Sequence, residues 1–434
     1  MLHRPLRVPY LQALKTILPG GALPLRLLKN SSALRTAAGF GLGGVGYALG
    51  NLLLARALPP AQFGVFTLFL ALVQIGASLA PIGLEGQLNR RPGGVVSLGR
   101  PLLTSVVVAA ATAVVASTLY RMDTALIVAL VLSITAGGTS RVASAAFQSR
   151  LRFGLALGLS QGLALALLGM GAFAVIAGGT QLRLLAALVA GYYVISSGVG
   201  WGILARERPR GPTEAHSFLE GLSLLGITAA ALILMQLERL LAPRLLTLED
   251  LATFAVVTTL VGSPLRMLQM GAGYTLLPRL STASTPEERR LLVRREAVAV
   301  MLIGGAAALV ILFAAPWIAA WLLAGKYELP TVLMIAALVS GAVKLADGFA
   351  TTMVWALGSA RQLALLNWVS WTCAGVGVIA AWLGSRWGLM GLMYGVTLGW
   401  VCRGAVAGAL AARLLRGGLL TGALQPGSPA RIPS

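Results

Sequence analysis

Charged side chains inside long apolar runs are the residues of this sequence best placed to do chemistry. Arg266, Lys344 and Arg403 are cations and Asp347 is an acid, and each lies within a stretch of mostly apolar residues. A charged group at membrane depth is costly, so such residues mark binding sites or ion pathways. A guanidinium presents a planar fork of donors that matches phosphate. The excess of cations therefore predicts a cavity for an anionic substrate.

Two structural readings compete with this interpretation. Lys344 and Asp347 lie three residues apart, on one face of a helix, and can form an ion pair that only stabilises the fold. Long basic side chains near the end of a span can also reach the headgroups and act as anchors. Both readings stay open for the remaining candidates, which lie near the ends of apolar runs: Arg141, Arg239, Glu238 and Arg56.

Enzyme chemistry has little support in the sequence. The two histidines, His3 and His216, lie outside the apolar runs, and no cluster of His, Cys and Asp has the spacing of a metal site. A phosphate-binding P-loop is absent from the sequence, so ATP hydrolysis by this chain is not expected. The sequence predicts neither a catalytic residue nor a metal or other cofactor.

The composition places the chain in a membrane. Hydrophobic residues make up 57% of it and charged residues 11%, whereas a soluble domain carries about 25% charged residues. A spanning helix needs roughly 20 mostly apolar residues. The sequence predicts an all-α polytopic protein with twelve spans: Thr36–Leu54, Phe63–Leu84, Leu102–Leu119, Thr124–Phe147, Phe153–Ala177, Leu184–Leu204, Phe218–Leu237, Leu251–Leu277, Ala297–Leu323, Thr331–Leu357, Leu363–Leu383 and Leu389–Leu415.

The distribution of Lys and Arg predicts the orientation. Most of the 34 basic residues lie in the N-terminal segment, the tail and alternate loops, and this basic side is the cytosolic side of a membrane protein. Both termini are then cytosolic. The net charge of +21 does not indicate a nucleic-acid-binding protein, because basic residues with interleaved aromatics form no stripe. The opposite loops hold few cations: Arg56, Arg121, Arg183, Arg239, Arg244, Lys326 and Arg386.

A repeat divides the chain into two halves. Arg56 matches Arg244 at a constant offset of 188 residues, as do Leu58 and Leu246, Phe66 and Phe254, and Arg91 and Arg279. Six spans in each half put the halves the same way up, which predicts two lobes related by a pseudo-two-fold axis along the membrane normal, around a central cavity. The expected parts are a basic leader (1–35), an N-lobe (36–205), a linker (206–217), a C-lobe (218–416) and a disordered tail (417–434).

Three motifs resemble one known family. The first is Leu54-Ala55-Arg56-Ala57-Leu58-Pro59-Pro60-Ala61-Gln62-Phe63-Gly64-Val65-Phe66, the second is Glu238-Arg239, and the third is Leu277-Pro278-Arg279-Leu280-Ser281. Together they are similar to the polysaccharide-transporter branch, which includes the O-antigen flippases, of the multidrug/oligosaccharidyl-lipid/polysaccharide (MOP) flippase superfamily. The chain departs from the pattern at Glu238, where the family has Asp, and at Ala252 and Phe254, where it has Gly and Tyr.

The resemblance implies a cargo and a mechanism. The cargo is an oligosaccharide linked to a polyprenyl pyrophosphate, moved across the cytoplasmic membrane by alternating access, with energy from an ion gradient or from mass action. Implied partners are membrane lipids and the polymerase and glycosyltransferases of glycan assembly. Neither the sugar nor the coupling ion is specified, and the acids near the membrane that can carry an ion are Asp347, Glu238 and Glu85.

Three other functions stay open. A drug/cation antiporter of the same superfamily uses an acidic site in its first half, often on its first helix, where this chain offers only Asn51. A major-facilitator transporter has a Gly-x-x-x-Asp-Arg-x-Gly-Arg loop, and 83–91 lacks its core. A scaffold for glycan-assembly enzymes needs no buried Arg266 or Arg403, so the accessibility of these positions to water separates it from a transporter.

Overall fold

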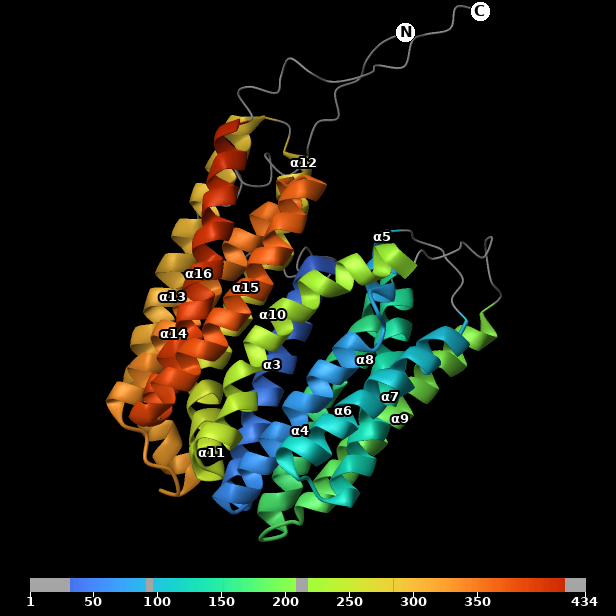
Figure 1. Ribbon diagram of the computed structural model, residues 1–434, viewed down its shortest axis with the longest axis vertical. Helices are drawn as coiled ribbons and strands as arrows, with labels where there is room; N and C mark the ends of the chain where they lie inside the picture. The colour runs from blue at the N-terminus through green and yellow to red at the C-terminus, as the bar shows by residue number, and fades with distance from the viewer. Residues whose placement is uncertain (1–31, 91–96, 151, 208–217, 284, 418–434) are drawn as a thin grey trace, which may run out of the picture.

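Long helices build the whole of the described chain. The computed structural model describes residues 32–90, 97–150, 152–207, 218–283 and 285–417. The expected leader, linker and tail lie almost wholly outside these ranges. The first half comprises α3 (Ser32–Ala57), α4 (Pro60–Leu79), α5 (Leu84–Arg90), α6 (Gly99–Tyr120), α7 (Thr124–Ser149), α8 (Phe153–Ile176) and α9 (Leu182–Arg206) (Figure 1).

The second half has the same number of long helical segments. It comprises α10 (Phe218–Leu245), α11 (Leu248–Val257), the π-helical turn η1 (Thr258–Gly262), α12 (Ser263–Thr282), α13 (Pro286–Leu323), α14 (Thr331–Leu357), α15 (Ala360–Gly384), the 3₁₀ turn η2 (Ser385–Trp387) and α16 (Gly388–Gly417). Taking α11, η1 and α12 as one segment, each predicted span lies on one of these helices. The largest differences are the start of α13, at Pro286 where Ala297 was predicted, and the end of α10, at Leu245 where Leu237 was predicted.

The chain is a multi-pass membrane protein. Among the described residues, nine stretches are long and apolar enough to cross a membrane, and the last of them, Arg361–Arg416, contains both α15 and α16. Much of the apolar surface is exposed rather than packed inside the protein. Trp317 and Trp321 on α13 are examples, and lipid is the solvent that such side chains need.

The two halves repeat the same helix pairings. In the first half α3 packs along α8, α4 along α7, and α7 along α9. In the second half α10 packs along α15, α12 along α14, and α14 along α16. Each second-half pair is the equivalent of a first-half pair when the long segments are counted in order. The repeat read from the sequence is therefore also a repeat of contacts.

Small residues allow close contacts between neighbouring helices, as in the pairs α3–α8 and α15–α16. A Cβ added to Gly50 of α3 would lie 2.6 Å from the backbone of Leu167 on α8. One added to Gly395 of α16 would lie 2.4 Å from the backbone of Ala380 on α15. Association between membrane helices relies on such close backbone contact, because lipid tails are as apolar as the side chains that they replace.

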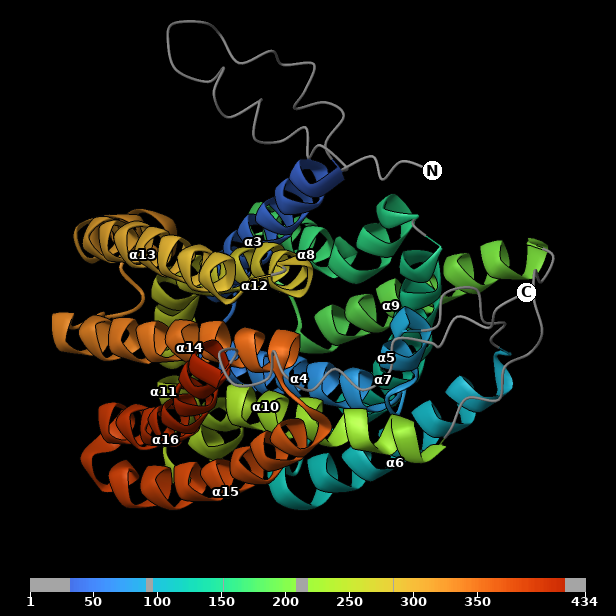
Figure 2. The ribbon, with the colours of Figure 1, turned by 90° about the horizontal axis from the view of Figure 1, so that it is seen from above.

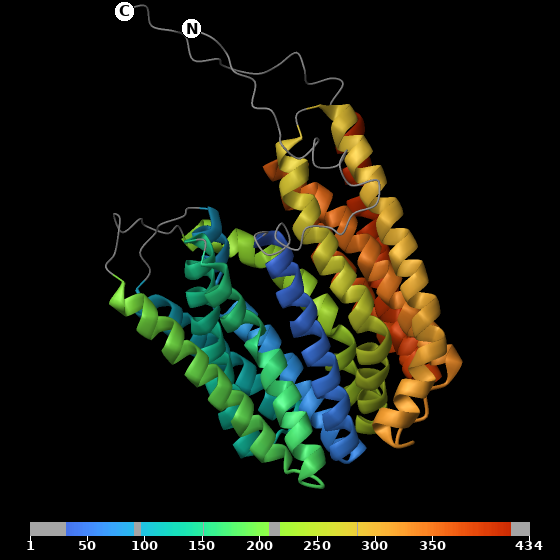
Figure 3. The same cartoon turned by 180° about the vertical axis from the view of Figure 1, so that it is seen from behind.

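The two halves diverge toward one end. The end that carries α5 is called the α5 end, and the opposite end, where α10 meets α11, is called the α11 end. Figure 1 and the reverse view in Figure 3 show the helix bundles close together at the α11 end and apart at the α5 end. Hydrogen bonds from side chains of one half to backbone carbonyls of the other lie at the α11 end among the described residues.

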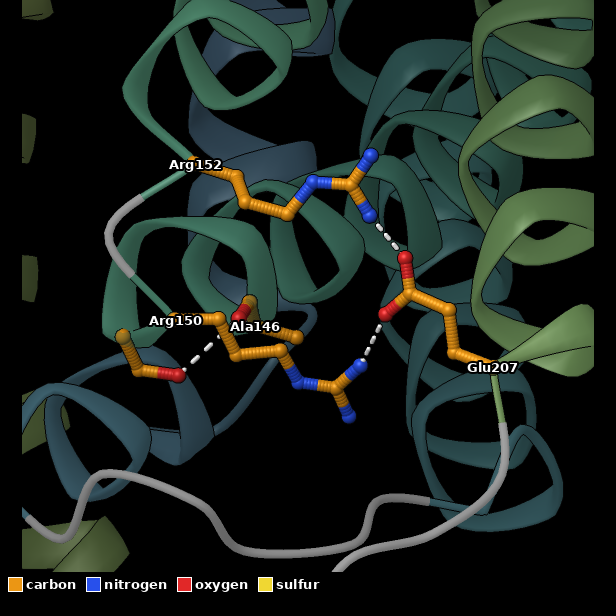
Figure 4. A network of polar contacts seen from close by, with 5 residues as sticks. Ala146, Arg150, Arg152 and Glu207 are labelled. Atoms are coloured by element: carbon orange, nitrogen blue, oxygen red, sulfur yellow. Dashed lines mark hydrogen bonds and ion pairs between the residues drawn. The ribbon is translucent and has the colours of Figure 1, made fainter.

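The first half closes with a network of charges at the α5 end (Figure 4). Glu207, just after α9, accepts hydrogen bonds from the guanidiniums of Arg150 and Arg152 in the α7–α8 turn, the former at 2.5 Å. Arg152 also lies over the ring of Phe147, 5.5 Å from its centroid. One carboxylate thus fixes the end of α9 to the neighbouring turn, at the point where the chain leaves the first half.

Candidate functional site

Two unpaired guanidiniums meet where the halves join. Arg266 lies in the first turn of α12, and its electrostatic neighbours are Tyr47 of α3 and Arg239 of α10. Its side chain is exposed although these neighbours come from both halves. No carboxylate is paired with Arg266 or Arg239 among the described residues. The place where α3, α10 and α12 meet therefore carries a net positive charge that is accessible to solvent.

The packing of α3 against α12 fixes the position of Arg266. A Cβ on Gly44 of α3 would lie 2.3 Å from the side chain of Met267, the residue that follows Arg266. Viewed from above, α3 and α12 lie side by side (Figure 2). The small residue on α3 thus allows the two halves to approach at the level of the guanidinium.

A helix irregularity precedes Arg266. The π-helical turn η1 (Thr258–Gly262) connects α11 to α12, and Pro264 follows at the second position of α12. Proline has no amide hydrogen, so the regular ladder is broken at this point. Such turns are common at functional sites because they redirect the side chains that follow.

Arg239 takes part in a polar link between the halves. Its guanidinium donates to the amide oxygen of Gln236 at 3.2 Å, and the amide nitrogen of Gln236 donates to Gln74 of α4 at 2.6 Å. Gln236 is almost fully buried. The link holds Arg239 in position without neutralising it. Sequence reasoning missed both glutamines, although an uncharged amide inside an apolar run is a detectable signal.

The other charged candidates form a second, neutral cluster inside the second half. Lys344 of α14 donates to Glu238 of α10 at 2.7 Å. Arg403 of α16 donates to Asp347 of α14, and its Nε donates to the hydroxyl of Ser370 on α15 at 2.9 Å. Each cation has its own carboxylate, so this cluster contributes no net charge.

Trp400 lies between the two ion pairs. The ammonium of Lys344 is 5.8 Å from the centroid of its ring, and the guanidinium carbon of Arg403 is 5.5 Å from it. Glu238 and Asp347 are each 1% exposed and Arg403 is 3% exposed. A tryptophan face attracts cations, which further stabilises both. The cluster is packed, with only Lys344 partly exposed, and it does not form an open binding surface.

These contacts change two of the interpretations made from sequence. Arg403 has no acidic residue near it along the sequence, yet it pairs with Asp347, because α14 packs along α16 and brings the two together. The alternative pairing of Lys344 with Asp347 is wrong, since each finds a partner on another helix. Both changes arise because distance along the sequence says nothing of neighbours across a helix interface.

Arg141 lies away from the centre. Its Nε donates to Glu85 of α5 at 2.8 Å, and the side chain of Arg141 is 44% exposed. This surface pair links α5 to α7 at the α5 end. Glu85 thus has its partner on another helix, far along the chain.

Arg56 belongs to a contact between the halves at the α11 end. It lies at the end of α3 and donates to the carbonyl of Leu322 near the end of α13, at 3.5 Å. At the equivalent place Arg244 of α10 donates to the carbonyl of Leu119 near the end of α6, at 2.9 Å. The two arginines matched by the sequence repeat therefore make reciprocal contacts, each to a helix of the other half.

Further hydrogen bonds reinforce both contacts. Lys326 donates to the carbonyls of Arg56, at 3.1 Å, and Leu58. Tyr120 donates to the carbonyl of Leu240 at 2.9 Å. We call the Arg56–Leu322 and Lys326 contacts the α3 clamp, and the Arg244–Leu119 and Tyr120–Leu240 contacts the α10 clamp. Together they join the halves at the α11 end, opposite the end where the halves diverge.

Comparison with known proteins relates this architecture to solved transporters. No protein-family model matches the chain, and no curated protein matches it in sequence. The crystal structure of a MATE protein in the bent conformation is 14% identical, with a TM-score of 0.56 over 90% of this chain and 96% of that one. An inward-facing multidrug resistance MATE family transporter of the MOP superfamily is also 14% identical, with a TM-score of 0.55 over 88% and 96%.

A third similar structure has a different pocket. It is a MOP superfamily transporter from Pyrococcus furiosus, 12% identical, with a TM-score of 0.56 over 89% of this chain and 95% of that one, described as having a binding pocket of reverse polarity that suggests a different function. The chain shares its fold with these MATE and MOP superfamily structures. At these identities the likeness concerns the fold alone, and the substrate has to be argued from the residues.

Proposed function

We propose that this protein is a flippase for lipid-linked oligosaccharides, in which Arg266 and Arg239 bind the pyrophosphate of a polyprenyl carrier. The observation that carries the proposal is the pair of guanidiniums at the junction of α3, α10 and α12, without a carboxylate among their described partners. Two adjacent cations repel each other, and a diphosphate relieves that repulsion while it accepts bidentate hydrogen bonds.

The geometry narrows the set of residues assigned to the substrate. Arg266 and Arg239 are the binding residues, and Tyr47, Gln74 and Gln236 position them. Arg403, Asp347, Lys344 and Glu238 form the paired cluster, whose role is to hold α10, α14 and α16 together. Arg56 acts in the α3 clamp, and Arg141 braces α5.

Alternating access supplies the motion. We take the two halves as lobes related by a pseudo-two-fold axis along the membrane normal, an arrangement supported by the repeated helix pairings. With the basic α5 end in the cytosol, the clamps close the outer side and the lobes part toward the inner side. The carrier headgroup enters from the cytoplasmic leaflet of the cytoplasmic membrane, and its tail stays in lipid. Polymerase and glycosyltransferases are the expected partners.

Substitution of the two guanidiniums tests the proposal. Arg266→Ala and Arg239→Ala each remove a charge-assisted interaction of about 1.5–3 kcal/mol, so export of lipid-linked sugar should fall about 10- to 100-fold at limiting substrate. Arg266→Lys keeps the charge and should retain part of the activity. Arg386→Ala, an exposed arginine on the same side as the clamps, is the matched control. Wild-type export by both alanine variants would refute the assignment.

The nearest rival is a drug/cation antiporter of the same fold. A cationic drug requires an unpaired acid, whereas Glu238 and Asp347 already bind cations of the protein. Measurements of drug resistance and of glycan export distinguish the two functions. A flippase should leave the resistance of cells to cationic drugs unchanged and lose glycan export in the Arg266→Ala variant, while an antiporter should show the opposite pattern.

A further inference from the structure

A cavity at the α11 end is not part of the central site. It has a volume of about 510 Å³ and lies at the α10 clamp, between the two halves. One wall comes from α4, another from the turn between α6 and α7, and the third from the junction of α10 and α11. The residues that line it are Val65, Leu68, Leu119, Tyr120, Arg121, Met122, Asp123, Leu126, Pro243, Arg244 and Leu248.

The cavity combines apolar walls with two guanidiniums. Arg121 and Arg244 are both exposed, and neither is paired with a carboxylate among the described residues. Arg244 uses Nη1 for the carbonyl of Leu119, which leaves its other donors available. The acid in the lining, Asp123, accepts from Arg183 at 2.9 Å. Free donors for an anion thus lie beside a surface suited to hydrocarbon.

The equivalent place in the other half is filled by the protein itself. Helices α6 and α13 both end in a left-handed residue, Arg121 with φ 49° and Ala324 with φ 52°. After α13 the longer connection 324–330 places Lys326 and the buried ring of Tyr327 against the end of α3. After α6 the shorter turn 121–123 leaves the corresponding space open, with an arginine at the capping position where glycine is usual.

The position of the cavity along the membrane normal indicates the kind of ligand that it binds. Arg121 lies two residues after the apolar stretch Gly99–Leu119, at the boundary between hydrocarbon and headgroups. Leu119 lines the cavity and is 47% exposed, which makes the cavity continuous with the lipid-facing surface. A ligand that reaches it from the membrane carries its anionic group at one end and hydrocarbon at the other.

We propose that this cavity binds the headgroup of an anionic phospholipid, with its phosphate between Arg121 and Arg244 and its acyl chains against Leu119, Leu68 and Leu126. The site lies at the α11 end, separate from Arg266, and its assignment does not depend on the flippase function. Because its walls come from both halves, a bound lipid strengthens the α10 clamp much as Lys326 strengthens the α3 clamp.

Lipid binding to the full-length protein tests this site. Delipidated protein in detergent is titrated with phosphatidylglycerol or phosphatidylcholine, and bound lipid is counted by native mass spectrometry. Phosphatidylglycerol should bind tighter, and the double variant Arg121→Asn, Arg244→Gln should weaken its binding about tenfold or more. Asparagine tolerates the left-handed backbone conformation of position 121, so the substitution should not destabilise the fold. Arg244→Lys keeps the charge and should retain most of the binding.

The controls separate this site from general attraction of anionic lipid to a basic protein. Arg386→Gln removes an arginine on the same side but outside the cavity, and it should leave the affinity unchanged. Glycerol 3-phosphate has the anion without acyl chains and should not compete at the same concentration. Equal binding of the two lipids, or an unchanged affinity in the double variant whose unfolding temperature matches that of the wild type, would overturn the proposal.

Discussion

At the scale of single residues, the same side-chain type serves two purposes in this protein. Arg403 is buried against Asp347, Ser370 and Trp400, whereas Arg266 is exposed at the junction of the halves. Burial without a partner would cost several kcal/mol for Arg403. The presence or absence of a nearby carboxylate therefore decides which arginine stabilises the fold and which is free to bind an anion.

Breaking the buried pair should destabilise the protein. Asp347→Asn leaves the guanidinium of Arg403 without its counter-ion, and loss of one partner of a buried pair costs about 3–5 kcal/mol. Replacing both residues, as Asp347→Leu with Arg403→Met, should restore most of the stability, because no charge then remains buried. Unfolding of the detergent-solubilised variants measures this. Arg141→Ala, which breaks an exposed pair, should cost about 1 kcal/mol or less. A double variant that is as unstable as Asp347→Asn would contradict this account.

Arg403 also shows how far sequence reasoning reaches at this scale. Its position inside an apolar run identifies it as a residue that needs an explanation. Its partner lies 56 positions earlier, on α14, and only the packing of α14 along α16 joins them. Arg266 could be singled out in the same way, but its neighbours Tyr47 and Arg239 depend on the assembly of three helices. Sequence identifies the charges, and tertiary packing decides their partners.

At the scale of helices, the pattern of apolar runs was sufficient to predict nearly every boundary. The length of an apolar run and the charges on either side of it determine where a membrane helix begins and ends. Inside lipid the backbone has to form intrahelical hydrogen bonds, because no water is there to replace them. The ends of α14 match the predicted span Thr331–Leu357. Helix α13 is the main difference: it begins at Pro286, well before the predicted Ala297. Thr285 caps a first turn that carries Glu287 and Glu288, and hydropathy alone does not recognise this charged segment as helical.

The π-helical turn η1 is the element whose removal should affect function most. Pro264→Ala restores the missing amide donor and lets α11 and α12 continue as a regular helix, which rotates Arg266 relative to α3. We expect a stable protein with export reduced at least severalfold, measured by glycan export together with the unfolding temperature. Pro316→Ala makes the same change inside α13, away from the site, and is the control. Equal export by both variants would show that η1 has no part in positioning Arg266.

At the scale of the whole molecule, the two clamps decide which end is closed. Arg56 and Arg244 occupy matching positions in the repeat and contact α13 and α6 of the opposite half. Gly64 of α4 packs against the carbonyl of Leu248 at the start of α11, where an added Cβ would lie 2.3 Å away. These contacts all lie at the α11 end. In the alternating-access cycle proposed above, they stabilise the state in which the α5 end is open, and a state closed at the α5 end would lose them.

The double variant Arg56→Ala, Arg244→Ala should therefore shift the population toward separation at the α11 end. A ligand or mutation moves a two-state equilibrium only by its difference in free energy between the states, and here both lost contacts belong to one state. Spin labels at Ser117→Cys on α6 and Glu328→Cys after α13, with Cys373→Ala and Cys402→Ala as background, report the distance across this end. We expect a longer-distance population that is larger in the double variant than in either single one. Arg386→Ala should leave the distribution unchanged, and a double variant identical to the wild type would mean that the closed end is held by apolar packing instead of by the clamps.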